Sequence, residues 1–351
     1  MSDEIDIRIV GLAGRITLCR PAALNALSYP MCLAIEAALD TWADDPKVAL
    51  IVIDAQGERA FCAGGDIAQM HAAGMQGDYS FGHRFWFDEY RMNAKMFHFP
   101  KPVVSFMQGF TMGGGVGVGC HGSHRVVGAT SKLALPECGI GLVPDVGSTL
   151  LLARAPGRLG EYLGTTGYRM GPGDAIHAGF ADYVIPEADW PDLIAELSAS
   201  GDWEAVDRAA QAVPDSPLAA AQGQIDRLFA GDTIRDVVNL LRVEESARAK
   251  DALAAIGRGS PLAVACTLEL VHRARLRDTI EHALEQEYRF SYRAMEHGDF
   301  LEGIRAAIID KDKSPKWRHE NIDTLPATTV AAMLMPLGRA SWSMDAKGYV
   351  A

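Results

Sequence analysis

The chain has 351 residues, with 33 Lys and Arg against 45 Asp and Glu, which gives a formal charge of −12. This length allows one large domain or two ordinary ones, and a content of 48% hydrophobic and 22% charged residues excludes global disorder. The negative balance argues against a nucleic-acid binder, because phosphate backbones are bound by clustered Lys and Arg.

The N-terminal part of the chain alternates strand-like and helix-like segments. Residues 5–10 and 15–19 are short apolar stretches around a glycine turn, which predicts a hairpin. Ser28 precedes four apolar residues at helical spacing, so we expect it to cap a helix that ends before Pro46. Residues 48–53 (VALIVI) form a continuous apolar run, which is typical of a strand buried on both faces.

The middle of the chain continues this alternation. A loop over residues 58–67 (ERAFCAGGDI) is followed by an aromatic-rich helix near residues 80–98. Residues 103–107 read as a further buried strand and lead into the glycine run MGGGVGVG at residues 112–119. Two more strand-like segments follow, HRVVG at residues 124–128 and KLALP at residues 132–136. The order predicts an α/β core with parallel strands.

The C-terminal half has a different pattern. From Trp190 onward the sequence is mostly amphipathic helix, with a clear helix start at Ser260. We therefore predict an α/β core over residues 1–190 and a helical region over residues 191–351. The last dozen residues are expected to form a poorly ordered tail.

Cysteines and the chain start bear on the compartment. The six cysteines are scattered, with no CxxC pair and no zinc-like spacing, which predicts reduced thiols and no metal site. The first ten residues are acidic, whereas targeting sequences are basic, and no apolar run approaches the ~20 residues of a membrane span. We expect a cytoplasmic protein without a membrane partner.

One glycine pattern suggests a nucleotide site. The glycines of Gly117-x-Gly119-x-x-Gly122, with Glu137 twenty residues beyond Gly117, match the spacing of a dinucleotide-binding fingerprint. However, the segment after the last glycine reads as a strand, and no βαβ unit surrounds the motif. We therefore favour a structural explanation, in which these glycines allow a helix to pack closely against the sheet.

A second pattern points to acyl chemistry. Two glycine turns, at residues 63–66 and 113–115, each follow a buried strand and precede a predicted helix. Unpaired amides at helix starts are donors in need of an acceptor, and two of them together can stabilise charge on a carbonyl oxygen. Glycine lets a substrate approach the backbone closely. Asp66 is expected to cap the helix that follows Gly65.

The order of four motifs, LCRPAALNALS, FCAGGDI, MGGGVG and PECGIGLVPDVG, resembles the crotonase superfamily, also called the enoyl-CoA hydratase/isomerase family. The resemblance implies a crotonase-like spiral of ββα turns followed by a helical C-terminal region. It also implies an acyl-CoA substrate whose thioester oxygen is held by the amides of Gly65 and Gly114. No separate cofactor is implied, because CoA is part of the substrate. A homo-oligomer would be consistent with the family.

The acids distinguish the branches of that superfamily. Hydratases carry a glutamate where this chain has Gly117, whereas their second glutamate is retained as Glu137. Asp145 occupies a position where hydratases usually have glycine. Together with the late motif IRAAIIDKDKSPKW at residues 304–317, this pattern resembles the branch that hydrolyses 3-hydroxyisobutyryl-CoA in valine degradation. The alternatives are an enoyl-CoA hydratase or isomerase acting on a short acyl-CoA, and an acyl-CoA-binding module without turnover.

The resemblance assigns roles to four side chains. Glu137 would be the base or the nucleophile, and Asp145 would bind the substrate hydroxyl or move a proton. Glu89 would reach the substrate pocket, and Arg20 would approach the CoA arm. The alternatives are structural: a turn cap for Glu137, a turn residue for Asp145, and a solvated helix face for Glu89, paired with Arg91 or Arg84.

Overall fold

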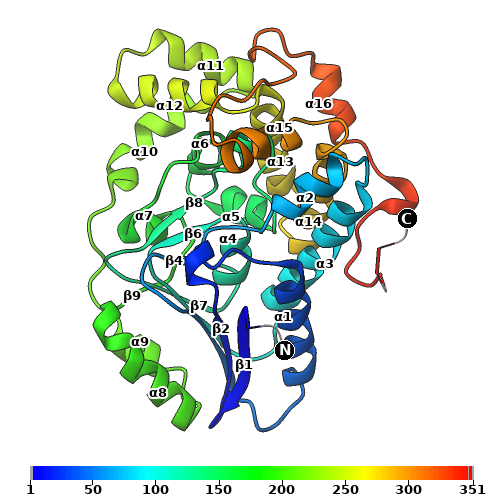
Figure 1. The fold of residues 1–351 in the computed structure, drawn as a ribbon. Helices are drawn as coiled ribbons and strands as arrows, with labels where there is room; N and C mark the ends of the chain where they lie inside the picture. The colour runs from blue at the N-terminus through cyan, green and yellow to red at the C-terminus, as the bar shows by residue number, and fades with distance from the viewer. Residues whose placement is uncertain (1–2, 347, 350–351) are drawn as a thin grey trace. The chain divides into compact units, whose positions relative to one another are not determined.

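The computed structural model describes residues 3–346, 348 and 349. Its chain divides into two compact units, each built from three segments (Figure 1). The sheet unit comprises Met1–Asp66, Arg91–Ala134 and Arg169–Ala219. The helical unit comprises Ile67–Tyr90, Leu135–Tyr168 and Ala220–Ala351. The predicted division into residues 1–190 and 191–351 stays a prediction.

The larger sheet of the sheet unit has six strands in the order β1-β2-β3-β5-β7-β9. Strands β1, β2, β7 and β9 are labelled in Figure 1. The strands are β1 (Ile5–Val10), β2 (Ala13–Leu18), β3 (Leu50–Ala55), β5 (Val103–Met107), β7 (His124–Val127) and β9 (Tyr183–Val184). The first two strands are antiparallel, which confirms the predicted hairpin, and the other neighbouring pairs are parallel. β3 is fully buried over its first four residues, as its continuous apolar run predicted.

A second sheet contains three short parallel strands, β4 (Ala60–Cys62), β6 (Phe110–Met112) and β8 (Lys132–Ala134). Each successive turn of the chain thus adds one strand to the large sheet and one to the small sheet. This arrangement confirms the predicted spiral. The sequence indicated a loop where β4 lies, because a strand of three residues is too short to show an alternating pattern.

The sheet unit also contains helices, some of which pack directly against its strands. They are α1 (Tyr29–Trp42), α4 (Gly114–Gly119), α7 (Pro172–His177), α8 (Trp190–Ser200) and α9 (Ala205–Ala209), with the 3₁₀ turns η1 (Pro21–Ala23) and η3 (Glu187–Asp189). Ser28 caps α1 by accepting a hydrogen bond from the amide of Met31, as predicted. Trp190 and Leu197 of α8 pack with Val104 and Phe106 of β5 in one buried cluster. Apolar packing therefore fixes the strands that lead into the glycine turns.

The helical unit contains most of the remaining helices. They are α2 (Ala68–Gly74), α5 (Ser148–Arg154), α6 (Leu159–Thr166), α11 (Ile234–Val243), α12 (Ala247–Arg258), α13 (Pro261–Leu276), α14 (Ile280–Ala294), α15 (Phe300–Ile304) and α16 (Ala327–Met333), with the short turns η2 (Glu137–Ile140), η4 (Arg305–Ile309) and η5 (Gly338–Ala340). Helices α3 (Ser80–Phe97) and α10 (Pro217–Leu228) begin in one unit and end in the other. Helix α13 packs against α5, α6, α14 and α16. Ser260 caps α13, as predicted.

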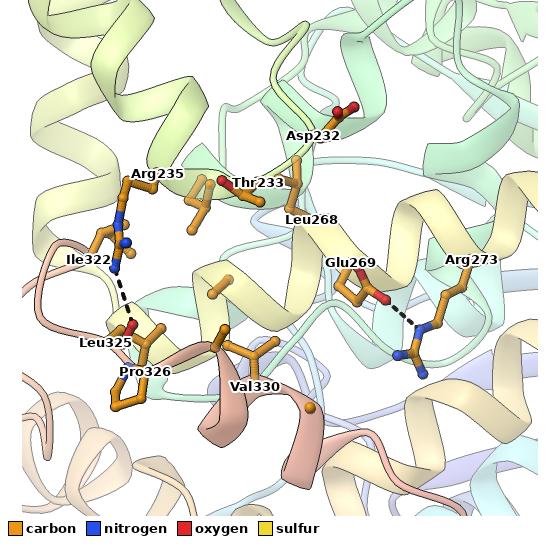
Figure 2. Close-up of a pocket in the computed structure, with 14 residues that line it drawn as sticks. Asp232, Thr233, Arg235, Leu268, Glu269, Arg273, Ile322, Leu325, Pro326 and Val330 are labelled. Atoms are coloured by element: carbon orange, nitrogen blue, oxygen red, sulfur yellow. Dashed lines mark hydrogen bonds and ion pairs between the residues drawn. The ribbon is translucent and has the colours of Figure 1, made fainter.

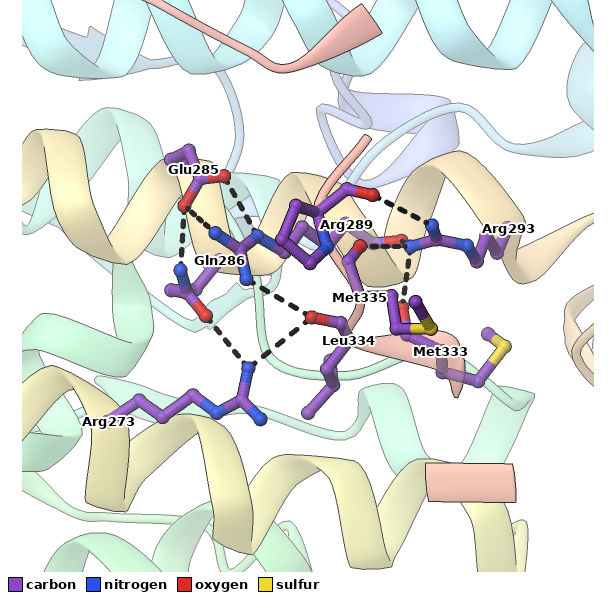
Figure 3. Close-up of polar contacts among 9 residues, drawn as sticks. Arg273, Glu285, Gln286, Arg289, Arg293, Met333, Leu334 and Met335 are labelled. Carbon is purple, nitrogen blue, oxygen red and sulfur yellow. Dashed lines mark hydrogen bonds and ion pairs between the residues drawn. The ribbon is translucent and has the colours of Figure 1, made fainter. Parts of the chain in front are cut away.

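Three arginines hold the end of α16 (Figure 3). Arg273 of α13 and Arg289 of α14 both donate to the carbonyl oxygen of Leu334, at 3.4 and 3.1 Å. Arg293 donates to the carbonyl oxygens of Met333 and Met335, at 3.0 and 2.7 Å. Cations at a helix C-terminus satisfy its free carbonyls and interact favourably with its dipole. The last helix is thereby fastened to α13 and α14.

The prediction of a poorly ordered C-terminal tail is wrong for the residues of the tail that the structure describes. Trp342 is buried, and its indole N–H donates to the carbonyl oxygen of Phe87 at 3.0 Å. Residues 347, 350 and 351 lie outside the described residues. A buried tryptophan that also forms a hydrogen bond fixes the chain around it.

Within the described residues, no single helix combines the length and the apolar composition of a membrane span. The pair α12 and α13 meets those criteria only when the two helices are taken together, and they are bent by 115° at their junction.

Candidate active site

The first glycine loop, residues 63–66, is held by the backbone of the segment before α1. The amide of Leu27 donates to the carbonyl oxygen of Gly64 at 2.9 Å, and the amide of Asp66 donates to that of Leu27 at 2.8 Å. Gly64 has φ +116°, a conformation that residues with a Cβ rarely adopt. The predicted donor, Gly65, therefore lies between two anchored neighbours.

Arg20 fixes the same loop from the other side. Its guanidinium donates to the carboxylate of Asp66 at 2.8 Å and to the carbonyl oxygen of Ala26 at 2.6 Å, and it pairs with Glu4 at 3.1 Å. The predicted helix cap at Asp66 is wrong, because α2 begins after Ile67 and Asp66 pairs with Arg20 instead. Contact between Arg20 and CoA stays a prediction.

The second glycine turn leads into the short helix α4. Gly113 has φ +51° and ψ −120°, and Gly114 is the first residue of the helix. An amide at this position has no acceptor within its own helix. A Cβ on Gly115 would lie 2.1 Å from the carbonyl oxygen of Cys62 in β4, far inside van der Waals contact. Packing of α4 against the small sheet, the structural reason favoured for the glycine run, therefore accounts for Gly115, whereas the role of the Gly114 amide as a donor stays a prediction.

The two adjacent glycines allow a paired test. Gly114→Ala adds a methyl group at the first position of the helix and, in a protein that circular dichroism shows to be folded, should lower the rate of thioester hydrolysis ~10²–10³-fold by displacing the carbonyl oxygen from the donor. Gly115→Ala should instead reduce the free energy of unfolding, because its Cβ collides with Cys62. Circular dichroism and urea unfolding distinguish the two effects. Full activity in a folded Gly114→Ala protein would remove Gly114 from the site.

In the helical unit, Glu137 lies at the start of η2 and is only 4% exposed. Neither of its carboxylate oxygens has a hydrogen-bond partner among the described residues. Burial raises its pKa well above the usual 4.5, and the nearby negative charge of Asp145 raises it further. Buried polar groups are nearly always paired, so an unpaired carboxyl group marks a position that a ligand or water can complete. Because both oxygens are unpaired, the cap proposed as an alternative is not observed.

Asp145 follows Pro144 and is also 4% exposed. Its carboxylate accepts a hydrogen bond from the hydroxyl of Tyr90 at 2.8 Å, and that hydroxyl lies 2.7 Å from the hydroxyl of Ser291. Burial raises the pKa of Asp145 above its usual value. The structure thus joins Asp145 to residues of α3 and α14 that the sequence did not indicate.

Glu89, one residue before Tyr90 in α3, is 3% exposed. The alternative of a solvated face paired with Arg91 is wrong: Glu89 is buried, and Arg91 pairs with Glu36 at 2.8 Å. Burial raises the pKa of Glu89 well above 4.5, and the negative charge of Asp145 adds to the increase. Three acids predicted from the sequence, Glu89, Glu137 and Asp145, therefore belong to one electrostatically interacting group in the helical unit.

The raised pKa of Asp145 predicts how stability varies with pH. Between its ordinary pKa of 3.8 and its raised folded-state pKa, the folded protein retains a proton that the unfolded chain has released, so the free energy of unfolding falls as pH rises. Asp145→Asn removes this dependence. We expect the variant to gain stability relative to the wild type between about pH 4 and about pH 7, measured by urea unfolding. A difference that does not change with pH would contradict the assignment.

A separate cavity of about 530 Å³ lies among α11, α13 and α16 (Figure 2). Both polar and apolar side chains line the cavity, and each of its two arginines has a partner within the protein. Arg235 donates to the carbonyl oxygen of Leu325 at 3.4 Å, and Arg273 pairs with Glu269 at 2.8 Å. The cavity is not lined by any of the site residues predicted from the sequence.

Comparison with known proteins identifies relatives over nearly the whole chain. A model of the enoyl-CoA hydratase/isomerase family matches residues 13–334. The mitochondrial 3-hydroxyisobutyryl-CoA hydrolase of Xenopus laevis is 36% identical over 340 residues, covering 93% of this chain and 88% of that protein. The 3-hydroxyisobutyryl-CoA hydrolase 1 of Arabidopsis thaliana is 33% identical, covering 90% and 87%.

Two solved structures are also similar. The crystal structure described as an enoyl-CoA hydratase from Rhodobacter sphaeroides 2.4.1 is 57% identical, with a TM-score of 0.94, and the match covers 97% of this chain and 99% of that one. The structure described as a carnitinyl-CoA dehydratase from Mycobacterium thermoresistibile is 39% identical, with a TM-score of 0.93, and covers 99% and 100%. Fold and family are thereby determined.

Proposed function

Because this chain belongs to the enoyl-CoA hydratase/isomerase family and its curated relatives hydrolyse 3-hydroxyisobutyryl-CoA, we propose that it is a hydrolase of this short 3-hydroxyacyl-CoA thioester. The reaction consumes water and yields a hydroxy acid and free CoA. It would serve valine degradation, the pathway that the sequence resemblance implied.

The observation that carries the proposal is the buried and unpaired carboxyl group of Glu137, close enough to Asp145 for their charges to interact. A raised pKa makes a carboxylate a stronger base or nucleophile once its proton has left. Water addition across a double bond uses two acids in this family, and the position of the first is occupied by Gly117. With only the second of these two acids present, the site is better suited to hydrolysis of the thioester than to addition of water across a double bond.

The proposed roles of the residues account for each step of the hydrolysis. The amides of Gly65 and Gly114 donate to the thioester oxygen and stabilise the negative charge that develops there. Glu137 either removes a proton from the attacking water or attacks the carbonyl carbon itself and is then released by water. The bond from carbon to sulfur breaks, and the departing CoA thiolate takes up the proton that the water has given up, so that one water yields one acid and one thiol. Asp145 binds the hydroxyl of the acyl group.

A second function is favoured by the solved structure described as an enoyl-CoA hydratase, which is 57% identical to this chain. A hydratase or isomerase would act on a short enoyl-CoA. The missing acid at Gly117 counts against a hydratase, whereas an isomerase can work with a single acid.

A panel of acyl-CoA thioesters tests the proposal. We expect free CoA to appear, detected with a thiol reagent, and to appear fastest with 3-hydroxyisobutyryl-CoA. Loss of enoyl absorbance without thiol release would instead identify a hydratase, and a shifted double bond would identify an isomerase. Tight binding without any turnover would identify a binding protein.

Two further assignments stay predictions. The animal relatives are named as mitochondrial proteins, and the cytoplasmic location expected for this chain stays a prediction. A homo-oligomer is consistent with the family.

A further inference from the structure

The turn that carries Asp145 has an unusual backbone. Val146 has φ +56° and Gly147 has φ +80°. A β-branched residue at positive φ is a genuine outlier, and such strain persists only where surrounding contacts hold it. The turn therefore requires an anchor outside itself.

Glu287 of α14 is that anchor. It is fully buried, and one carboxylate oxygen accepts a hydrogen bond from the amide of Gly147 at 2.7 Å. The other oxygen accepts two, from the amide of Thr149 at 3.0 Å and from the hydroxyl of the same residue. The Glu287 carboxylate thus accepts three hydrogen bonds from two residues, Gly147 in the strained turn and Thr149 in the first turn of α5.

The same helix also reaches the side chain of Asp145. Ser291 lies four residues after Glu287, on the same face of α14. Its hydroxyl is 2.7 Å from that of Tyr90, which donates to the carboxylate of Asp145. Helix α14 therefore holds both the backbone that follows Asp145 and the partner of its carboxylate.

We propose that Glu287 is a positioning residue for thioester hydrolysis, which fixes the turn so that the Asp145 carboxylate is held ready for the substrate. The inference rests on the proposed function. Glu287 acts through the turn and does not itself react.

The cost of burying this group supports a functional role. Burial raises the pKa of Glu287 to about 8, and the negative charge of Asp145 also raises it. A buried acid next to other acids is expensive, and apolar packing would usually serve stability better. Glutamine at this position has the same shape, but its amide N–H₂ would face one of the backbone donors instead of accepting from it.

The test compares Glu287→Gln with a matched buried acid, Glu161→Gln. Glu161 is also fully buried in the helical unit, where it pairs with Arg275 at 2.7 Å. We expect Glu287→Gln to lower kcat for CoA release ~10²-fold, because a small misplacement of an active-site group has such an effect. Glu161→Gln should lower the free energy of unfolding while kcat keeps its wild-type value.

A double-mutant cycle tests whether Glu287 affects kcat through Asp145. If Glu287 acts through Asp145, then adding Glu287→Gln to Asp145→Ala should cause little further loss of kcat, since the residue that it positions is gone. Losses that multiply would overturn the inference, as would wild-type kcat in a folded Glu287→Gln protein. Thr149→Val removes a single donor from the anchor and should reduce kcat less, so it replaces Glu287→Gln in the same cycle if that variant does not fold. A wild-type protein that releases no CoA would instead contradict the proposed function.

Discussion

Replacement of Glu137 by glutamine is expected to lower kcat for thioester hydrolysis by ~10²–10⁴-fold, while the affinity for the acyl-CoA stays close to that of the wild type. The side chain keeps its size but loses the ability to take a proton or to attack a carbonyl carbon. Both carboxylate oxygens lack a hydrogen-bond partner among the residues that the structure describes, so the substitution breaks no hydrogen bond within that part of the protein. The loss should therefore be chemical rather than structural.

Steady-state CoA release and calorimetric binding of a non-hydrolysable acyl-CoA analogue measure the two quantities separately. Glu161→Gln is the matched control, since it also removes a buried carboxylate from the helical unit. Glu137→Gln should be at least as stable as the wild type, because it removes a carboxyl group whose burial is unfavourable to its charged form. Retention of most of the wild-type rate would exclude Glu137 from the mechanism.

Asp145 should make the enzyme selective for substrates that carry a hydroxyl group on the acyl chain. A buried carboxylate that binds a hydroxyl is left without that partner when the substrate lacks it, and such sites discriminate by ~10⁴-fold or more. The wild type should therefore prefer 3-hydroxyisobutyryl-CoA over isobutyryl-CoA by about this factor. Asp145→Ala should lose far more activity on the hydroxylated substrate than on the plain one, so that the preference collapses.

The ratio of kcat/KM for the two substrates, in wild type and variant, measures this preference directly. Asp299→Ala serves as control: Asp299 is another buried aspartate of the helical unit, but its carboxylate is engaged by the hydroxyl of Ser260 at 2.6 Å and the amide of Arg318 at 2.9 Å. Its substitution should cost stability without changing the ratio. Equal losses on both substrates in Asp145→Ala would place Asp145 in the chemical step or in the turn, and not in recognition.

Much of the fold could be predicted because its strongest signals are local. The apolar run at β3 and the cap at Ser28 each depend on a few adjacent residues, and both predictions are confirmed. Strands β4 and β6 are short and lie directly before the two glycine turns, and the sequence indicated those turns rather than the strands.

The candidate site was harder to predict because its contacts are distant in sequence. The hydroxyl of Tyr90 joins Asp145, 55 residues away, to Ser291, 201 residues away. Serine and glutamate on an amphipathic helix resemble ordinary surface residues, so nothing in the sequence distinguished Ser291 or Glu287. Glu89 was ambiguous for a related reason: aromatic residues occur all round α3, and the pattern could not identify its buried face.

The central claim is that this chain cleaves a thioester rather than removing or adding water. The most direct measurement follows 3-hydroxyisobutyryl-CoA through one complete reaction and counts both products, free thiol by a colorimetric reagent and enoyl-CoA by its ultraviolet absorbance. We expect one thiol for each substrate molecule consumed and no rise in enoyl absorbance. Consumption of the substrate with enoyl absorbance and without thiol would contradict it.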